Sequence, residues 1–393
     1  MPRSGTGVEE RYSYLRRMHQ RYQESHRKQR GYLLDEIVRH TGLNRKYACH
    51  LMNKSVGPAR KTRQRHRGRH YNHQVDDAIR IIGETLDWVC AERMTPVLAD
   101  TAELLAAHGE LELDDELRQA LGRISISTVG RIVARLRQDE YRLPQRRGRR
   151  RPASSLLAGI PAGCIAWEEP DPGHFETDTV MHCGPDGSGD VVCSVQMIDV
   201  KTGWSERRAI LGRGQQRTKE AFAYMLERCP IPIREIHPDN GPEFMNHHLL
   251  QFFRDKAKGI KLSRSRPYQK NDNRFVEQKN YTLIRAYLGH MRLDTQPQCD
   301  LLNELYDAMW VYYNCYQPVL RQVRKTVSYD QYHVPHIHRW HDLARTPLQR
   351  LLECDVLEEA ERQELLELRQ MINPRTLRRD IQRMLERLWA MAS

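Results

Sequence analysis

The pattern of hydrophobic and polar positions divides the chain into a helical N-terminal half, an α/β segment and a helical C-terminal region. In residues 31–54, apolar residues lie at helical spacing on either side of Gly42: Leu34, Ile37, Val38, Leu43, Tyr47 and Leu51. Gly42 permits a tight turn between two short helices. The pattern predicts a helix-turn-helix, although a small helical hairpin without a DNA-binding role has the same pattern.

A second helical region is predicted for residues 74–138. One amphipathic stripe contains Val75, Ile79, Ile82, Leu86 and Val89. Pro96 is expected to open another helix, and Ser127 is expected to be the N-cap of a third. The third helix would carry Val129, Ile132, Val133 and Leu136. The region is either a second helix-turn-helix or a purely structural three-helix unit.

Residues 142–160 are rich in Arg, Pro, Gly and Ser, have no periodicity and predict a linker. Beyond them, short β-type runs alternate with helices. Strands are predicted over 174–183, 190–200, 204–211, 233–238 and 260–263. Helices are predicted over 215–228, 242–257 and about 273–288. This order of elements is the ribonuclease H-like (RNase H-like) plan, a mixed sheet flanked by helices.

The remainder of the chain is predicted to be mostly helical. One helix carries Leu301, Leu302, Leu305, Met309, Tyr312 and Tyr313. A proline- and histidine-rich connection follows over about 318–341, and two further helices are expected over 346–372 and 374–391. These last two helices would serve self-association or DNA contact, and their sequence does not decide which.

The predicted fold class is therefore multi-domain α + α/β, with five segments. They are a helix-turn-helix region with a basic tail (1–73), a second helical or helix-turn-helix domain (74–141), a basic linker (142–163), an RNase H-like core with a mixed sheet (164–295) and a helical C-terminal region (296–393).

The net charge of +12 is concentrated in two runs, residues 60–69 and 142–151. Such runs neutralise phosphates and bind nucleic acid in a salt-dependent way, whereas a single run is often only a solvated linker. Two runs beside predicted helix-turn-helix units favour double-stranded DNA as the partner. The second helix of the first unit would present Asn44, Arg45, Lys46 and His50 to the major groove. The expected DNA contacts in this half are Arg45, Lys46, Arg60, Lys61, Arg63, Arg65 and Arg131.

The composition excludes several classes of protein. A mean hydropathy of -0.75, and the lack of any run of about 18 apolar residues, argue against a membrane span and a membrane partner. The first residues lack the apolar segment of a secretory signal. The nine cysteines have no CxxC spacing, which argues against a disulfide framework and against a zinc module. We expect a cytoplasmic protein that associates with the nucleoid when it binds DNA.

Three acidic residues occupy positions suited to holding metal ions. Asp178 lies inside the first predicted strand, where an ionised carboxylate is costly unless it is paired or metal-bound. Asp239 follows the fourth strand at an Asn240-Gly241 turn, and Glu277 lies one turn into the helix that begins near residue 273. Phosphodiester chemistry uses two divalent ions about 3.5–4 Å apart, and such hard cations prefer carboxylate oxygens. The placement predicts a metal-dependent phosphodiester site.

Neighbouring acids have other interpretations. Glu176 lies on the same strand face as Asp178 and is its competitor, either as the ligand or as a supporting residue. Asp199 begins a turn, a common use of Asp. Glu243 suits the first turn of a helix, and Asp272 suits an N-cap.

Three blocks closely resemble the catalytic blocks of insertion-sequence transposases with a retroviral-integrase-type DDE core. They are HFETDTVMHCG from residue 174, HPDNGPEFMNHHLLQFF from residue 237 and RSRPYQKNDNRFVEQKN from residue 264. The resemblance covers about residues 165–290. It implies that Asp178, Asp239 and Glu277 are both the catalytic residues and the metal ligands. The 37 residues between Asp239 and Glu277 are slightly more than is usual in the family.

The resemblance also implies two Mg²⁺ (or Mn²⁺) ions per active site, DNA ends and target DNA as substrates, and a homodimer or higher oligomer on DNA. Cations expected near the DNA are Arg264, Arg266, Lys270 and Lys279, each of which could instead be an ordinary surface residue. Tyr268 would stack on a base, and Asn240 would orient the turn or the DNA backbone.

The implied mechanism has two steps. Water attacks the phosphodiester at the element end and frees a 3′-OH, which then attacks a target phosphorus without a covalent protein–DNA intermediate. Two alternatives stay open. A DNA-binding regulator with an inactive integrase fold would lack one of the three acids, and an RNase H-type nuclease would not need helix-turn-helix units ahead of its core.

Overall fold

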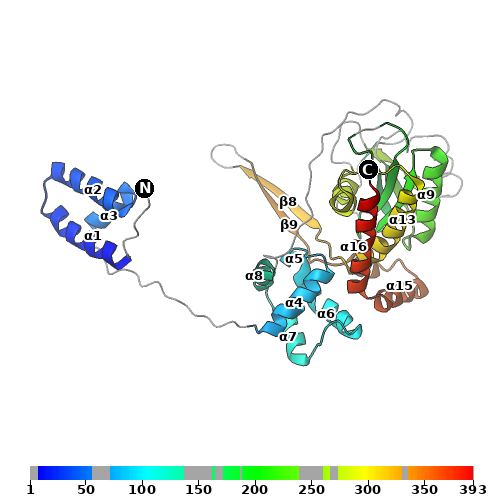
Figure 1. The fold of residues 1–393 in the computed structure, drawn as a ribbon, viewed down its shortest axis with the longest axis horizontal. Helices are drawn as coiled ribbons and strands as arrows, with labels where there is room; N and C mark the ends of the chain where they lie inside the picture. Colours follow the sequence, from blue (N-terminus) through cyan, green and yellow to red (C-terminus); the bar gives the residue numbers. More distant parts are fainter. Residues whose placement is uncertain are drawn as a thin grey trace. The chain divides into compact units, whose positions relative to one another are not determined.

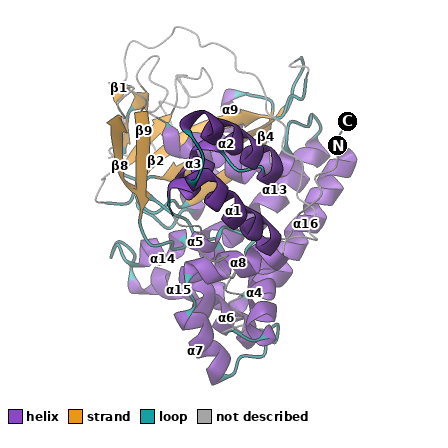
Figure 2. Cartoon of the chain, turned by 90° about the vertical axis from the view of Figure 1, so that its left-hand side faces the viewer, coloured by secondary structure: helices purple, strands orange, loops and turns teal. Residues whose placement is uncertain are grey.

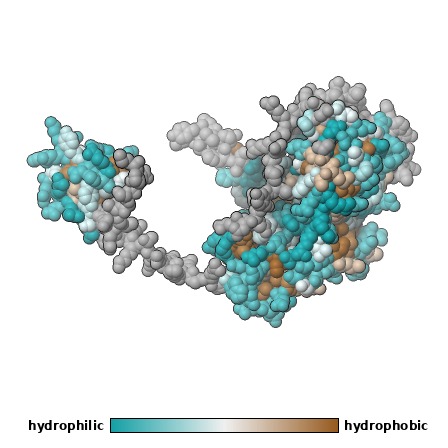
Figure 3. Space-filling model, in the orientation of Figure 1, coloured by the Kyte–Doolittle hydropathy of each residue, from teal (hydrophilic) through white to brown (hydrophobic). Residues whose placement is uncertain are grey.

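The structure is a computed structural model that describes residues 8–54, 71–136, 162–163, 171–185, 188–238, 260–265, 273–329 and 335–392. The chain forms two compact units, Met1–His70 and Tyr71–Ser393 (Figure 1). Both present a mainly hydrophilic surface on the face drawn in Figure 3, with hydrophobic residues gathered in small separate patches. None of the described helices is long and apolar enough to cross a membrane.

The N-terminal unit contains three helices, α1 (Val8–Gln23), α2 (Arg27–Thr41) and α3 (Arg45–Asn53). Gly42 ends α2 in the left-handed region at φ 68°, and the Asn44 side chain accepts a hydrogen bond from the backbone N–H of Lys46 to begin α3. The unit has its own core of Leu15, Met18, Tyr22, Leu33, Leu34, Ile37, Ala48 and Met52.

One predicted core position of this unit is wrong. Tyr47 was expected in the apolar stripe, but it is 47% exposed, and Ala48 and Met52 face the core instead. The face of α3 that packs on α1 and α2 is therefore turned by one residue from the predicted stripe. Asn44, Arg45, Lys46 and His50 are exposed, as a helix-turn-helix requires.

The second unit begins with a helical region: α4 (His73–Thr85), α5 (Ala91–Met94), a 3₁₀ turn η1 (Thr95–Val97), α6 (Leu98–Ala107), α7 (Asp115–Arg123) and α8 (Ile126–Leu136). The predicted stripe is buried throughout, both within α4 and at Leu86 and Val89 after it. Val129, Ile132 and Val133 of α8 are buried as well. The predicted cap at Ser127 is wrong. The helix begins two residues earlier because the Ser125 hydroxyl accepts a hydrogen bond from the Thr128 backbone N–H at 3.3 Å.

A five-stranded mixed sheet with the strand order β4-β3-β2-β5-β6 is the centre of the second unit. Strands β2 (His174–Met181), β3 (Val192–Asp199) and β4 (Ser205–Leu211) form an antiparallel meander. Strand β5 (Glu235–Pro238) pairs with β2 in parallel, and β6 (Lys261–Leu262) pairs with β5 in parallel. This order and these directions are those of the RNase H-like plan, and the predicted fold class is confirmed.

The further helices of the second unit pack on the sheet or on one another (Figure 2). They are α9 (Gln215–Arg228), α11 (Arg274–Lys279), a π-helix η3 (Asn280–Arg285), α12 (Ala286–Leu288), α13 (Gln296–Val311), a second π-helix η4 (Tyr312–Tyr316), α14 (Pro347–Leu352), α15 (Glu359–Met371) and α16 (Pro374–Met391). Apolar residues of the sheet, α9, α13 and the last three helices share one core. A short parallel pair, β1 (Ala162–Gly163) and β7 (Arg264–Ser265), lies outside the main sheet.

Two predictions for the C-terminal region are wrong. The single helix expected over 346–372 is two helices, because the chain turns at Asp355, which has φ 48°, and Glu358 then begins α15 with a capping box. The expected connection over 318–341 contains an antiparallel hairpin, β8 (Gln322–Tyr329) and β9 (Pro335–His341). The predicted helix 242–257 lies outside the described residues.

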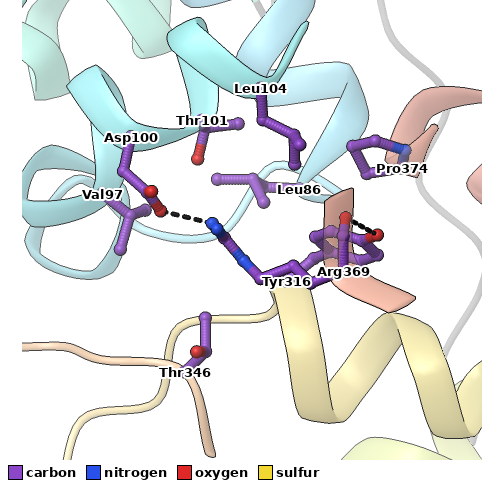
Figure 4. A pocket seen from close by; sticks show the side chains of 9 residues that line it. All are labelled: Leu86, Val97, Asp100, Thr101, Leu104, Tyr316, Thr346, Arg369 and Pro374. Atoms are coloured by element: carbon purple, nitrogen blue, oxygen red, sulfur yellow. Dashed lines mark hydrogen bonds and ion pairs between the residues drawn. The ribbon is translucent and has the colours of Figure 1, made fainter. Parts of the chain in front are cut away.

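Ion pairs join the α4–α8 region to the C-terminal helices. Arg375 of α16 contacts Glu84 at 2.8 Å and Glu110 at 3.0 Å, and Arg369 of α15 contacts Asp100 at 2.5 Å. A cavity at this junction, drawn in Figure 4, has a volume of about 10 Å³, which is room for one water molecule at most. The junction is a packed interface to which α15, α16 and η4 contribute, since the Tyr312 hydroxyl of η4 donates to Thr85 O at 2.6 Å.

Candidate functional site

Asp178 lies in β2, the central strand of the sheet. Its neighbour across the antiparallel ladder is Gln196 of β3. One carboxylate oxygen, Oδ1, accepts a hydrogen bond from the Thr179 backbone N–H at 2.8 Å. Asp178 is only half-buried although the strand around it is largely buried, so its carboxylate lies where the interior of the sheet meets solvent.

Asn280 connects Asp178 to the helix that carries Glu277. Its amide nitrogen, Nδ2, donates to Asp178 Oδ2 at 2.5 Å, and its carbonyl oxygen, Oδ1, accepts from Gln196 Nε2 at 3.0 Å. Asn280 and Gln196 are both buried, so these bonds are shielded from water. The three side chains form a chain of hydrogen bonds from β3 through η3 to β2, which fixes the Asp178 carboxylate.

Glu277 lies in α11, three residues before Asn280. Its backbone N–H donates to Asn273 O at 3.0 Å, and its side chain is exposed. Residues three apart on a helix lie on the same side. Glu277 therefore lies on the side of the helix from which Asn280 contacts Asp178. The structure thus brings β2, which carries Asp178, and α11, which carries Glu277, together.

Glu176 is fully buried and holds the beginning of α11. Its Oε2 accepts hydrogen bonds from the backbone N–H groups of Phe275 at 2.7 Å and Val276 at 3.0 Å. These are among the N–H groups that have no partner within their own helix, and the positive end of the helix dipole stabilises a carboxylate there. Glu176 is therefore joined to the helix of Glu277.

The end of β5 approaches the same part of β2. The parallel register pairs Pro238 with Thr177, the residue before Asp178. At the other end of β5, burial opposes ionisation of Glu235, but hydrogen bonds from His174, Ser263 and Lys261 outweigh it and lower the pKa of Glu235 to about 2. This carboxylate joins β2, β5 and β6. Asp239, which follows Pro238, lies outside the described residues.

The donor groups present here suit a hard divalent cation. Asp178 and Glu277 offer carboxylate oxygens, the ligands that Mg²⁺ and Mn²⁺ prefer, from neighbouring elements. Within the residues that the structure describes, no three His, Cys, Asp or Glu side chains are grouped closely enough to hold a metal ion. The described part of the site therefore contains two of the three predicted ligands.

Lys279 ends α11 and is partly buried. Burial and the nearby guanidinium groups of Arg93 and Arg207 lower the pKa of its ammonium group to about 7. Arg207 itself is fully buried and lies over the rings of Tyr306 and Tyr313. Lys279, Arg93 and Arg207 thus form a group of cations near α11, the helix that carries Glu277.

The other predicted contacts fall into two groups. Arg45 and Lys46 of α3 and Arg131 of α8 are exposed, and Arg45 forms an ion pair with Asp35. Arg264 lies in β7, and its side chain is not described. The remaining predicted residues lie outside the described part of the chain: Arg60, Lys61, Arg63, Arg65, Asn240, Arg266, Tyr268 and Lys270.

Sequence reasoning missed Asn280 and Gln196. Asn280 could have been found, because it follows Glu277 by three residues on a predicted helix and has an amide suited to a carboxylate. Gln196 could not, because its position opposite Asp178 depends on the register of β2 and β3, which the sequence does not state.

The chain is similar in sequence to an uncharacterized bacterial protein, and weakly similar in structure to retroviral integrases. No family model matches the chain. The catalytic core domain of BIV integrase is 16% identical over 37% of this chain and 85% of its own, with a TM-score of 0.28. The HTLV-2 integrase catalytic core domain, solved in complex with magnesium, is 18% identical over 38% and 91%, with a TM-score of 0.28. A simian T-cell lymphotropic virus intasome is 14% identical over 56% and 70%, with a TM-score of 0.31.

At these TM-scores the likeness adds nothing to the fold assignment, which depends on the order and directions of the strands. The sequence comparison is stronger. The uncharacterized protein y4rM of Sinorhizobium fredii is 32% identical over 311 residues, which are 78% of this chain and 86% of that protein. The chain belongs to the same protein family as y4rM.

Proposed function

We propose that the chain is a DDE transposase that binds the ends of a mobile DNA element and catalyses their cleavage and transfer to target DNA. The observation that carries the proposal is the hydrogen bond from Asn280 to Asp178, because it holds the carboxylate of the central strand against the helix of Glu277. The three sequence blocks that resemble the catalytic blocks of such transposases support the same assignment.

Asp178, Asp239 and Glu277 are the proposed metal ligands. Asp239 is the next residue in the sequence after Pro238, which ends β5 and is paired with Thr177 of β2. Two Mg²⁺ or Mn²⁺ ions held by these carboxylates would activate the nucleophile and stabilise the leaving oxygen. Glu176 is assigned to holding α11 and not to the metal, since its carboxylate is buried against that helix.

The residues around the ligands keep the site in one geometry. Asn280 and Gln196 orient the Asp178 carboxylate before substrate binds, and Glu176 fixes the start of α11. Such preorganisation matters because a carboxylate displaced by about 1 Å loses much of its effect on the rate. Side chains of this kind do not enter the reaction.

The proposed reactions balance without a covalent enzyme intermediate. In the first, water attacks a phosphorus at the element end, and the bond to the 3′ oxygen breaks. In the second, that 3′-OH attacks a phosphorus of the target, forms one phosphodiester and releases one target 3′ oxygen. The exposed face of α3, with Arg45, Lys46 and His50, is the proposed contact to the element ends.

The test uses the full chain and duplex DNA that carries the sequences flanking its own gene. Asp178→Asn preserves the shape and removes the charge, so with Mg²⁺ we expect cleavage and strand transfer to fall by at least about 10³-fold while DNA binding stays within about twofold. Glu220→Gln, an exposed acid-to-amide change on α9, is the matched control and should retain full activity.

The alternatives give other results in the same assay. Retained strand transfer by Asp178→Asn would overturn the proposed site. Binding without cleavage by the wild-type chain would favour a regulator with an inactive fold. Cleavage restricted to the RNA strand of an RNA–DNA hybrid would favour an RNase H-type nuclease.

A further inference from the structure

The β8–β9 hairpin is a sheet of its own that projects from the body of the second unit (Figure 1). Its described side chains are largely exposed: Val323 is 58% exposed, Val327 46% and Trp340 45%. A two-stranded ribbon is marginally stable by itself, and exposed apolar residues add a further cost. A ribbon of this kind is suited to being covered by a partner.

The charge of the ribbon is of one sign. Neither strand contains Asp or Glu, whereas the two strands contain Arg324, Lys325 and Arg339 and the histidines His336, His338 and His341. The register places Lys325 directly opposite Arg339. Like charges at directly opposed positions destabilise an antiparallel pair. The ribbon is therefore expected to be more stable with an anionic partner bound than alone.

An aromatic ring lies among these cations. Trp340 is opposite Arg324 in the register, and the guanidinium carbon of Arg324 lies 5.3 Å from the centre of the indole ring. The His338 ring is 6.2 Å from the same ring. Cations interleaved with an exposed aromatic residue are typical of surfaces that bind nucleic acid.

The root of the ribbon is fixed beside the candidate site. At the base of the two strands the Asp342 backbone N–H donates to Arg321 O at 2.9 Å, and the Arg321 backbone N–H donates to the Asp342 carboxylate at 2.9 Å. Arg350 forms an ion pair with the same carboxylate at 2.6 Å. The guanidinium carbon of Arg321 also lies 5.5 Å from the ring of Phe275, which is in α11 two residues before Glu277. DNA held along the ribbon would therefore reach the helix that carries the proposed metal ligand.

We propose that the β8–β9 hairpin is a binding arm for double-stranded DNA. A two-stranded ribbon fits the major groove of B-DNA, and the cations of both strands can then face phosphates on its two sides. The identity of the anion as DNA rests on the proposed transposase function, whereas the binding itself does not require catalysis.

The test measures the affinity of the full chain for a short labelled DNA duplex by fluorescence anisotropy across a series of salt concentrations, without divalent metal. The double variant Arg324→Gln/Arg339→Gln is compared with Arg213→Gln/Arg383→Gln, which removes the same charge from exposed positions outside the ribbon. We expect the ribbon variant to lose at least about tenfold in affinity, and its dependence of log K on log salt to become shallower by about two units. The control pair should change neither.

Trp340→Ala supplies a second variant that leaves the charge intact, and its circular dichroism and melting temperature show whether the unit is folded. We expect a loss of several-fold in affinity without a change in the salt dependence. The proposal would be overturned by unchanged affinity in both ribbon variants or by an equal loss of affinity in the control pair. Tighter binding of single-stranded DNA than of duplex would also overturn it. So would self-association of the free chain that the ribbon variants abolish.

The two proposals fail separately. Loss of cleavage in a chain that still binds duplex through the ribbon contradicts only the proposed enzyme. Full cleavage by the ribbon variants at saturating DNA, with unchanged affinity, contradicts only the proposed arm.

Discussion

The two helical regions of the N-terminal half received the same interpretation from sequence but differ in how they are stabilised. The first, α1–α3, has a closed core of its own and forms a separate unit. The second, α4–α8, also has a core, but it belongs to the unit of the sheet, and its acids are paired with arginines of the C-terminal helices.

The difference assigns the two regions different tasks. The α4–α8 region is joined by several half-buried ion pairs to α15 and α16, which share a core with the sheet, so it is suited to supporting the unit that carries the candidate site. The first region presents exposed cations on α3, and the ion pair of Arg45 with Asp35 lies within the region itself, so this region is suited to binding DNA on its own. The helix-turn-helix pattern alone does not distinguish these uses.

The largest expected effect comes from the core of the first unit. Ile37→Ala removes a fully buried side chain and should cost about 3 kcal/mol in the free energy of unfolding. Hydrogen exchange read separately for the two units should show faster exchange in α1–α3 and no change beyond Tyr71. Equal acceleration in both units would contradict their independence.

Arg375→Ala should have the next largest effect, on the second unit. It leaves the carboxylates of Glu84 and Glu110 without their cation in a half-buried interface, at a cost of about 2 kcal/mol, below the range for fully buried pairs. Urea unfolding of the second unit measures the loss. Arg383→Ala, which removes an exposed pair with Asp380, is the matched control and should change stability by less than about 0.5 kcal/mol.

The Arg375 interface should also respond to pH. Hydrogen bonds from Asn373 and Arg375 lower the pKa of Glu110 below its ordinary value of 4.5. The folded state therefore binds this proton less readily than the unfolded state, so the stabilisation is complete above pH 4.5 and is lost as the pH falls below it. The stability difference between wild type and Glu110→Gln should shrink on acidification, and a constant difference from pH 7 to pH 3 would contradict this.

The smallest expected effect concerns the exposed pair of Arg45 and Asp35 in the first unit. Asp35→Asn should change the free energy of unfolding by less than about 0.5 kcal/mol, since both side chains are more than half exposed. It frees the guanidinium of Arg45, so the affinity for duplex DNA should rise about two- to threefold, with a steeper salt dependence. A fall in affinity would contradict the assignment of α3 as the contact.

The predictable parts of the fold are those that local pattern determines. The short β-type runs in 174–211 and the 3.6-residue periodicity of α9 and α13 are sufficient to predict their secondary structure. The β8–β9 hairpin was missed because its strands are rich in Arg and His and contain Pro335, so no apolar alternation marks them. The break at Asp355 was missed because the Leu-rich periodicity resumes after it.

The candidate site divides in the same way. Asp178 and Glu277 were predicted because their blocks are distinctive. The structure adds that Asn280, which accepts a hydrogen bond from Gln196, joins Asp178 to the helix that carries Glu277. The role of Glu176 was open from sequence because it shares a strand face with Asp178. Only the placement of α11 shows that it holds the helix.

The central claim is that Asp178, Asp239 and Glu277 hold metal ions at one place, and iron-directed cleavage of the protein tests it without any DNA substrate. Fe²⁺ replaces Mg²⁺ in the site, and hydroxyl radicals produced with ascorbate and peroxide cut the nearby backbone. The account predicts cuts clustered around residues 178, 239 and 277, competed by Mg²⁺, absent in Asp178→Asn and retained in Glu220→Gln. Cuts that persist in Asp178→Asn, or that cluster elsewhere in the chain, would contradict it.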